Sequence, residues 1–139
     1  MKDCLQILVA DDDFEDRTIM SECFKDLGHS NAIKFVEDGS ELLTYLDNKT
    51  DEIVTLIVLD LNMPRLNGTE TLRMLKSIPG YSNIPVIIFS TSVNEIERKN
   101  CMALGAREYV TKAGKWDEYL DTCRRLYSIS QEPLQPMVA

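Results

Sequence analysis

Residues 56–60 read Leu-Ile-Val-Leu-Asp, so an acidic side chain follows directly on a short apolar run that contains β-branched residues. At three other places a polar or charged side chain likewise follows a short strand-like run. These are Ile-Leu-Val-Ala at 7–10 before Asp11 and Asp12, Val-Ile-Ile-Phe at 86–89 before Ser90, and Tyr-Val-Thr at 109–111 before Lys112. The carboxyl ends of buried strands open onto the ligand crevice of a parallel sheet. We therefore expect these polar side chains to meet at one edge of such a sheet.

Strand-like runs alternate with helix-period segments five times along the chain, which predicts βα units and a sheet covered on both faces. We expect a three-layer α/β/α sandwich with a five-stranded parallel sheet, a flavodoxin-like, doubly wound (βα)5 fold. Besides the strands above, the pattern predicts a strand at 32–36 and extends the last strand to 108–111. The predicted helices carry apolar residues at helical spacing within 19–27, 42–46, 72–75 and 116–127. The second of these helices is expected to end near 47–49, and a further helix is expected from about 93 to 104.

The length of 139 residues fits one domain, which we place at residues 1–130, with a flexible tail at 131–139 that contains Pro133 and Pro136. An apolar fraction of 44% and a charged fraction of 27% exclude a disordered chain. The four cysteines show no metal-ligand spacing and are expected to be reduced thiols. The last helix is expected to be core on one apolar face, with a homodimer contact as the alternative; the residues of this face are Trp116, Tyr119, Leu120, Cys123 and Tyr127.

The overall charge argues against two classes of partner. A net charge of −8 and a pI near 4.6 disfavour binding to nucleic acid or to an anionic membrane, because both need clustered Lys and Arg. No window approaches the roughly 20 apolar residues that a membrane span requires, and no secretory signal is evident. We therefore expect a cytoplasmic protein.

Asp11, Asp12 and Asp60 would repel one another at a shared sheet edge, since two like charges about 4 Å apart cost roughly 4 kcal/mol at an effective dielectric of 20. A divalent cation such as Mg²⁺ would offset this repulsion with the oxygen ligands it prefers. The competing explanation for the two adjacent aspartates is helix capping. Asp13 and Glu15 can take that role, which leaves Asp11 and Asp12 for the metal.

A carboxylate beside a metal-clamped phosphoryl group can attack phosphorus and form an acyl phosphate. Asp60 is the candidate nucleophile, with Ser90 placed to hydrogen-bond one phosphoryl oxygen and Lys112 to neutralise another. The product would be a covalent mark on the protein itself.

The sequence from about Gln6 to Tyr127 resembles the receiver domain of two-component response regulators. Four stretches carry the resemblance: Ile7 to Asp13, Leu59 to Pro64 with Gly68, Ile84 to Thr91, and Gly105 to Lys112. The resemblance implies that Asp60 is the phosphoacceptor and that Asp11, Asp12 and Asp60 hold Mg²⁺ with the backbone carbonyl of Asn62. It further implies phosphoryl contacts from Ser90 and Lys112, a switch made of Ser90 and Tyr109, and an influence of Asn62 and Ser92 on phosphate lifetime.

Two departures from the family pattern stand out. Ala113 follows Lys112 where the family usually has proline after a cis bond, and a cis bond before alanine would cost about 2.5–4 kcal/mol. The spacing from Asp12 to Asp60 is also a few residues longer than in chemotaxis-type receivers, with the excess placed at 48–53. This length, with Asp-Leu-Asn-Met-Pro at 60–64 and Ser-Thr-Ser at 90–92, is similar to stand-alone regulators that partner bacterial phytochromes and hybrid kinases.

The resulting hypothesis is a single-domain response regulator that accepts phosphate from a sensor or hybrid histidine kinase and switches its binding surface for a downstream protein. One alternative is a haloacid-dehalogenase-like phosphohydrolase, which also forms an aspartyl phosphate. That class carries Asp-x-Asp early in the chain, whereas residues 60–62 here read Asp-Leu-Asn and lack the second acid. Another alternative is a degenerate receiver that serves only as a scaffold, which the complete acidic set disfavours.

Overall fold

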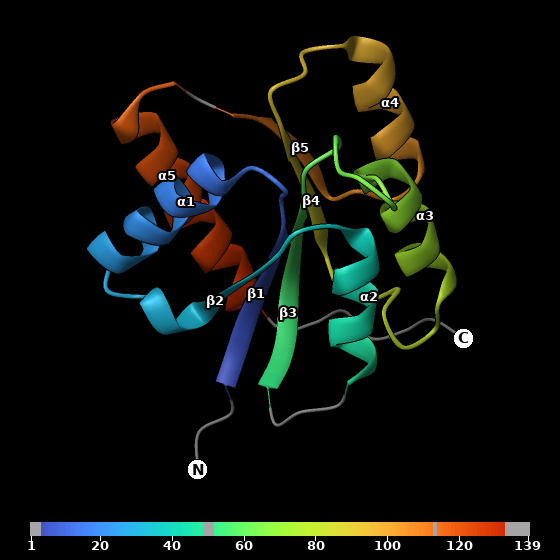
Figure 1. Cartoon of the computed structure of the whole chain (residues 1–139), viewed down its shortest axis with the longest axis horizontal. Helices are drawn as coiled ribbons and strands as arrows, with labels where there is room; N and C mark the ends of the chain where they lie inside the picture. The colour runs from blue at the N-terminus through green and yellow to red at the C-terminus, as the bar shows by residue number, and fades with distance from the viewer. Residues whose placement is uncertain (1–3, 49–51, 113, 133–139) are drawn as a thin grey trace.

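The computed structural model describes residues 4–48, 52–112 and 114–132 (Figure 1). Five strands and five α-helices alternate along them, with one short 3₁₀ turn. The elements are β1 (Cys4–Ala10), α1 (Phe14–Asp26), η1 (Ser30–Ala32), β2 (Ile33–Val36), α2 (Gly39–Asp47), β3 (Glu52–Leu59), α3 (Gly68–Ser77), β4 (Val86–Ser90), α4 (Glu95–Ala103), β5 (Glu108–Thr111) and α5 (Trp116–Ser130).

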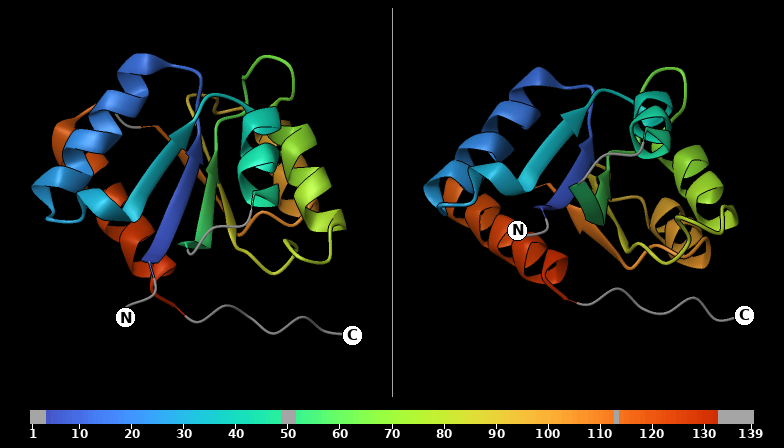
Figure 2. Two further views of the ribbon diagram at one scale, coloured as in Figure 1. Left: turned by 60° about the horizontal axis from the view of Figure 1, so that its bottom comes forward. Right: turned by 90° about the horizontal axis from the view of Figure 1, so that it is seen from below.

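All strand pairs are parallel, and the sheet order is β2-β1-β3-β4-β5. Helices α1 and α5 cover one face, whereas α2, α3 and α4 cover the other (Figures 1 and 2). The predicted three-layer, flavodoxin-like α/β sandwich is therefore confirmed. The strand order reverses between β1 and β3, which in open α/β sheets is where ligand crevices form.

Successive residues of each strand alternate between the two faces of the sheet, so the strands contribute side chains to two separate hydrophobic cores. The core under α1 and α5 takes the strand residues Ile7, Val9, Leu56, Val58, Ile87 and Phe89. The core under α2, α3 and α4 takes Leu8, Ala10, Ile57, Leu59, Val86 and Ile88. Because both faces are buried, the strands are continuously apolar, which is the pattern the sequence displays.

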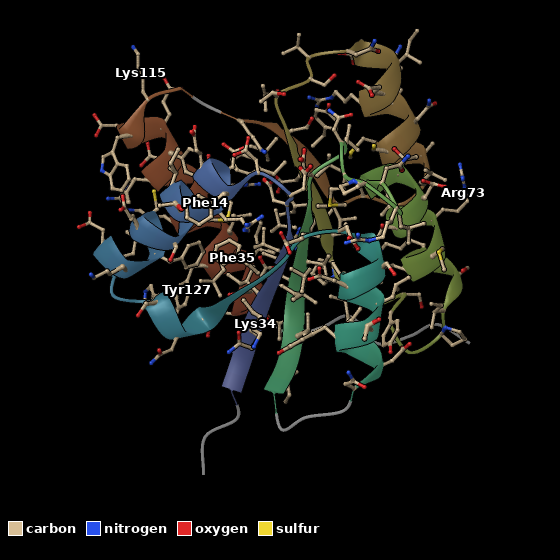
Figure 3. All side chains as sticks on the ribbon, viewed as in Figure 1. Phe14, Lys34, Phe35, Arg73, Lys115 and Tyr127 are labelled. Atoms are coloured by element: carbon tan, nitrogen blue, oxygen red, sulfur yellow. The ribbon has the colours of Figure 1, made fainter. Side chains whose placement is uncertain are left out.

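Aromatic contacts close the layer formed by α1 and α5. Tyr119 of α5 packs edge-on against Phe89 of β4, with ring centroids 5.4 Å apart. Tyr127, labelled in Figure 3, stacks on His29 beyond the end of α1 at 3.6 Å. These contacts hold α5 against β4 and against the segment that follows α1.

Two helix predictions need correction. Helix α4 begins at Glu95, not at Val93, because the side chain of Asn94 caps the helix by accepting hydrogen bonds from the N–H groups of Ile96 and Glu97. Trp116 was placed on the apolar face of the last helix, but its side chain is 44% exposed at the first position of α5.

Some sequence predictions fall partly outside the described residues. Cys23, Cys101 and Cys123 are buried free thiols, as expected, whereas the side chain of Cys4 is not described. The Lys112–Ala113 bond, residues 49–51 of the 48–53 insertion and most of the proposed tail also lie outside. Within the described ranges, no helix combines the length and the apolar character that crossing a membrane requires.

Candidate functional site

The three predicted carboxylates meet at the carboxyl edge of the sheet. The parallel register pairs Ala10 of β1 with Leu59 of β3, so Asp11 and Asp60 leave adjacent strands at the same level. The N–H of Asp60 donates to the carbonyl of Ala10 at 3.0 Å and extends the strand pairing to this point. Carboxylate oxygens of Asp11, Asp12 and Asp60 lie within 4.8 Å of one another. This oxygen-rich set fits a hard divalent cation such as Mg²⁺.

Burial and mutual repulsion change the acidity of this cluster. Burial raises the pKa of Asp60 to about 6; the charges of Asp11 and Asp12 add to the increase, while Lys112 and a hydrogen bond from the N–H of Asn62 oppose it. The pKa of Asp11 is also raised, mainly by burial and against a hydrogen bond from Lys112. The site therefore holds two carboxylates whose charges the protein alone does not fully neutralise.

Lys112 enters the cluster from the end of β5. Its Nζ lies 2.8 Å from Oδ2 of Asp11, 2.6 Å from Oδ2 of Asp16 and 3.9 Å from Oδ1 of Asp60, and its side chain is 5% exposed. The backbone N–H of Lys112 donates to the carbonyl of Ser90 at 2.8 Å, which ties the end of β5 to the end of β4. Burial alone would lower the pKa of Lys112, but its bonds to Asp11 and Asp16 outweigh this and raise it.

Of the predicted switch residues, Ser90 is the last residue of β4 and Tyr109 lies within the neighbouring strand β5. Ser90 is fully buried, and its Oγ accepts a hydrogen bond from the N–H of Ser92 at 3.1 Å. Tyr109 is 8% exposed, and its hydroxyl donates to the carbonyl of Ser92 at 2.9 Å. The aromatic ring thus occupies an inward position in the structure.

Asp13 provides the helix cap that the sequence suggested for this segment. Its carboxylate accepts hydrogen bonds from the N–H groups of Glu15 and Asp16 at the start of α1. Arg17, one turn into the helix, donates to the carbonyl of Asp11 at 2.7 Å. Capping therefore falls to Asp13, and the side chain of Asp12 stays with the acidic cluster.

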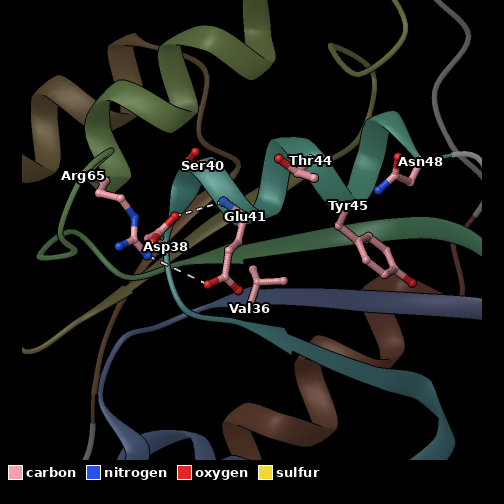
Figure 4. A pocket seen from close by; sticks show the side chains of 8 residues that line it. All are labelled: Val36, Asp38, Ser40, Glu41, Thr44, Tyr45, Asn48 and Arg65. Atoms are coloured by element: carbon pink, nitrogen blue, oxygen red, sulfur yellow. Dashed lines mark hydrogen bonds and ion pairs between the residues drawn. The ribbon is translucent and has the colours of Figure 1, made fainter.

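The loop that follows Asp60 is fastened to the start of α2 (Figure 4). The guanidinium of Arg65 pairs with the carboxylate of Asp38, which is fully buried, and lies 3.9 Å from Glu41. The N–H of Gly39 also donates to the carbonyl of Leu66 at 3.2 Å. Burial of Asp38 would raise its pKa, but hydrogen bonds from the N–H of Glu41 and from Arg65 keep it lowered.

Arg65 carries a backbone cost at this position, because its φ of 62° lies in the left-handed region. We expect Arg65→Ala to lower the free energy of unfolding by about 1–3 kcal/mol, since the fully buried carboxylate of Asp38 loses its guanidinium partner and the strain remains. Arg65→Gly loses the same pair but relieves strain of about 1 kcal/mol, so its loss of stability should be smaller than that of Arg65→Ala by about 1 kcal/mol. Urea denaturation of the three proteins checks this, and equal losses in both variants would contradict it.

Several residues at the site were not found by sequence reasoning. Asp16 was not recognised because an acidic residue in a first helical turn is explained by the helix dipole alone. Arg65 and Asp38 were missed because their pairing joins segments 27 residues apart, and a single sequence shows no such contact. The one local signal for an ordered loop at 62–68 is its content of Asn, Pro and Gly.

The chain is similar to known proteins over most of its length. The response regulator receiver domain family matches residues 7–124. The chain is 34% identical over 119 residues to the two-component response regulator ARR15 of Arabidopsis thaliana, which covers 80% of this chain and 57% of that protein. It is also 34% identical over 108 residues to a gliding motility regulatory protein of Myxococcus xanthus, covering 78% of this chain but only 13% of that protein.

Two solved structures are similar over nearly their full length. The phosphorylated cyanobacterial phytochrome response regulator RcpA is 27% identical with a TM-score of 0.82, covering 94% of this chain and 98% of RcpA. The Mn²⁺-bound form of response regulator Rcp1 is 25% identical with a TM-score of 0.78, and the match covers 95% of this chain and 99% of Rcp1. Sequence and fold therefore place the chain in the response regulator receiver domain family, the phosphoacceptor modules of two-component signalling.

Proposed function

We propose that Asp60 accepts a phosphoryl group from the phosphohistidine of a sensor or hybrid histidine kinase and stores it as an acyl phosphate. One observation carries the proposal: three carboxylates converge within 4.8 Å, with the ammonium of Lys112 against them. Two of the three are buried, so the negative charge is concentrated where a cation and a phosphoryl group would offset it.

In the transfer step, a carboxylate oxygen of Asp60 forms a bond to phosphorus while the phosphorus–nitrogen bond to the kinase histidine breaks. The imidazole leaves and recovers its proton from solvent. With a pKa of about 6, Asp60 is mostly ionised at neutral pH and is available as a nucleophile. Lys112, 3.9 Å from Asp60, and the hydroxyl of Ser90 would hold phosphoryl oxygens.

The metal ligands in this proposal are Asp11, Asp12, Asp60 and the backbone carbonyl of Asn62. Bound Mg²⁺ would supply the charge that lets an anionic nucleophile approach an anionic phosphoryl group. The oxygen donors and the raised pKa values of Asp11 and Asp60 support such a cation, and the Mn²⁺-bound form of Rcp1 supports a divalent metal in a related structure.

The output of this domain is proposed to be a change of its protein-binding surface. Ser90 would turn its hydroxyl from the N–H of Ser92 towards the new phosphoryl group, and Tyr109 would stabilise the rearranged segment between β4 and α4. A downstream protein would read the surface of α4, β5 and α5. For the upstream partner, the likeness to RcpA and to RPA3017, a response regulator in red light signaling of R. palustris, favours a phytochrome-type kinase.

The proposal is tested by incubating the chain with radiolabelled acetyl phosphate, with either Mg²⁺ or EDTA present. We expect acid-stable, alkali-labile label on the protein with Mg²⁺ and almost none with EDTA, because an acyl phosphate hydrolyses in alkali. The same preparation should not turn over p-nitrophenyl phosphate. Absence of label with Mg²⁺ would support a scaffold, and steady ester turnover would support a phosphohydrolase. A panel of candidate kinases would then identify the partner.

A further inference from the structure

The contact between Lys112 and Asp16 is the shortest that the lysine ammonium makes with the carboxylates around it. Nζ of Lys112 lies 2.6 Å from Asp16, 2.8 Å from Asp11 and 3.9 Å from Asp60. Asp16 is separated from Lys112 by 96 residues in the sequence, and its side chain is 24% exposed at the rim of the site. It is not one of the three carboxylates that could share a metal ion.

The backbone of Asp16 is fixed at the start of α1. Its N–H donates to the capping carboxylate of Asp13 at 3.3 Å, and its carbonyl accepts from the hydroxyl of Tyr119 of α5 at 3.5 Å. An acidic residue in a first helical turn would be stabilising without any lysine. Glu15 lies in the same turn and is exposed, although it has the same favourable interaction with the helix dipole. The dipole therefore does not explain why the Asp16 side chain points towards Lys112.

We propose that Asp16 is a positioning residue that aims the ammonium of Lys112 at the phosphoryl site; this inference rests on the function proposed above. Lys112 has a flexible four-carbon side chain with three donors, so it needs partners that define one direction. Asp11 is shared with the proposed metal, whereas Asp16 lies outside the metal set and can keep its contact when phosphate arrives. Asp16 thereby leaves the third donor of Lys112 facing Asp60.

The test compares initial rates of phosphorylation by acetyl phosphate at saturating Mg²⁺. We expect Asp16→Ala to lower the maximal rate by about tenfold, because a misaimed group stabilises the transition state poorly. Asp16→Glu should recover the rate to within about threefold by restoring a carboxylate on the same helix face. Glu15→Ala, a change of equal charge in the same turn, should stay within about twofold of the wild type.

A double-mutant cycle separates positioning from a general effect on the fold. In a Lys112→Met background, Asp16→Ala should cause no further loss of rate, since the lysine it would aim is gone. Urea denaturation in EDTA should show coupling between the two positions without any phosphorylation. If the wild type takes up no label, the proposed function fails. If the wild type is labelled but Asp16→Ala matches Glu15→Ala, or still slows the Lys112→Met protein, the role of Asp16 is overturned.

Discussion

Asp60→Asn is expected to abolish phosphorylation, with the initial rate falling by at least about a hundredfold, because an amide oxygen does not replace a carboxylate as the nucleophile. The variant should still fold. Asparagine has nearly the volume of aspartate, and the substitution removes a charge that burial and the neighbouring Asp11 and Asp12 disfavour. Circular dichroism and a cooperative thermal transition would verify folding, and label from acetyl phosphate with Mg²⁺ measures the effect.

Asp13→Asn is the matched control for this substitution. It makes the same chemical change two residues from Asp11, but Asp13 caps α1 and is not in the acidic cluster. Because asparagine caps helices as well as aspartate does, both stability and labelling should be close to those of the wild type. Label that persists in Asp60→Asn and maps to a peptide with Asp11 or Asp12 would show that the nucleophile lies directly after β1, which would contradict the assignment to Asp60.

The sheet and the acidic cluster were predictable because both depend on short-range patterns. Each strand is a run of apolar residues, and the side chain after it must emerge at the carboxyl edge once the strands are parallel. Asp11 and Asp60 meet for that reason alone, as the register of β1 with β3 shows. The start of α4 was less predictable, because Val93 fits a helical apolar pattern and only the cap at Asn94 excludes it.

The contacts that orient the cluster were not predictable in the same way. Lys112 could be placed at the edge of the sheet, but its contact with Asp16 depends on how α1 packs against the sheet, which no local pattern encodes. The pairing of Arg65 with Asp38 likewise depends on a residue at positive φ in an irregular loop. The direction of a long side chain depends on the packing around it, so its partners can be identified only from the tertiary structure.

The free energy of unfolding in EDTA is expected to fall as the pH rises from about 4 to about 6. The pKa of Asp60 is raised to about 6 in the folded protein, chiefly by burial, from an ordinary value of 3.8. Between these values the folded state binds more protons than the unfolded state. The stability that the protonated Asp60 contributes is therefore fully present below about pH 4 and is lost as the pH rises through about 6. The total loss attributable to this carboxyl is of order 2–3 kcal/mol.

Comparison with Asp60→Asn isolates this contribution, because Asp11 and the other titrating groups stay in place. The variant and the wild type should have similar stability near pH 4, and the variant should be more stable by about 2 kcal/mol above pH 7 in EDTA. Mg²⁺ should act in the opposite sense by stabilising the wild type by about 2.7 kcal/mol at a hundredfold excess over its dissociation constant, and the variant by less. Urea denaturation from pH 4 to 8 measures both effects. Wild-type and variant curves that stay parallel across this range, or that Mg²⁺ leaves unchanged, would show that Asp60 is not a buried carboxylate in a metal-binding cluster.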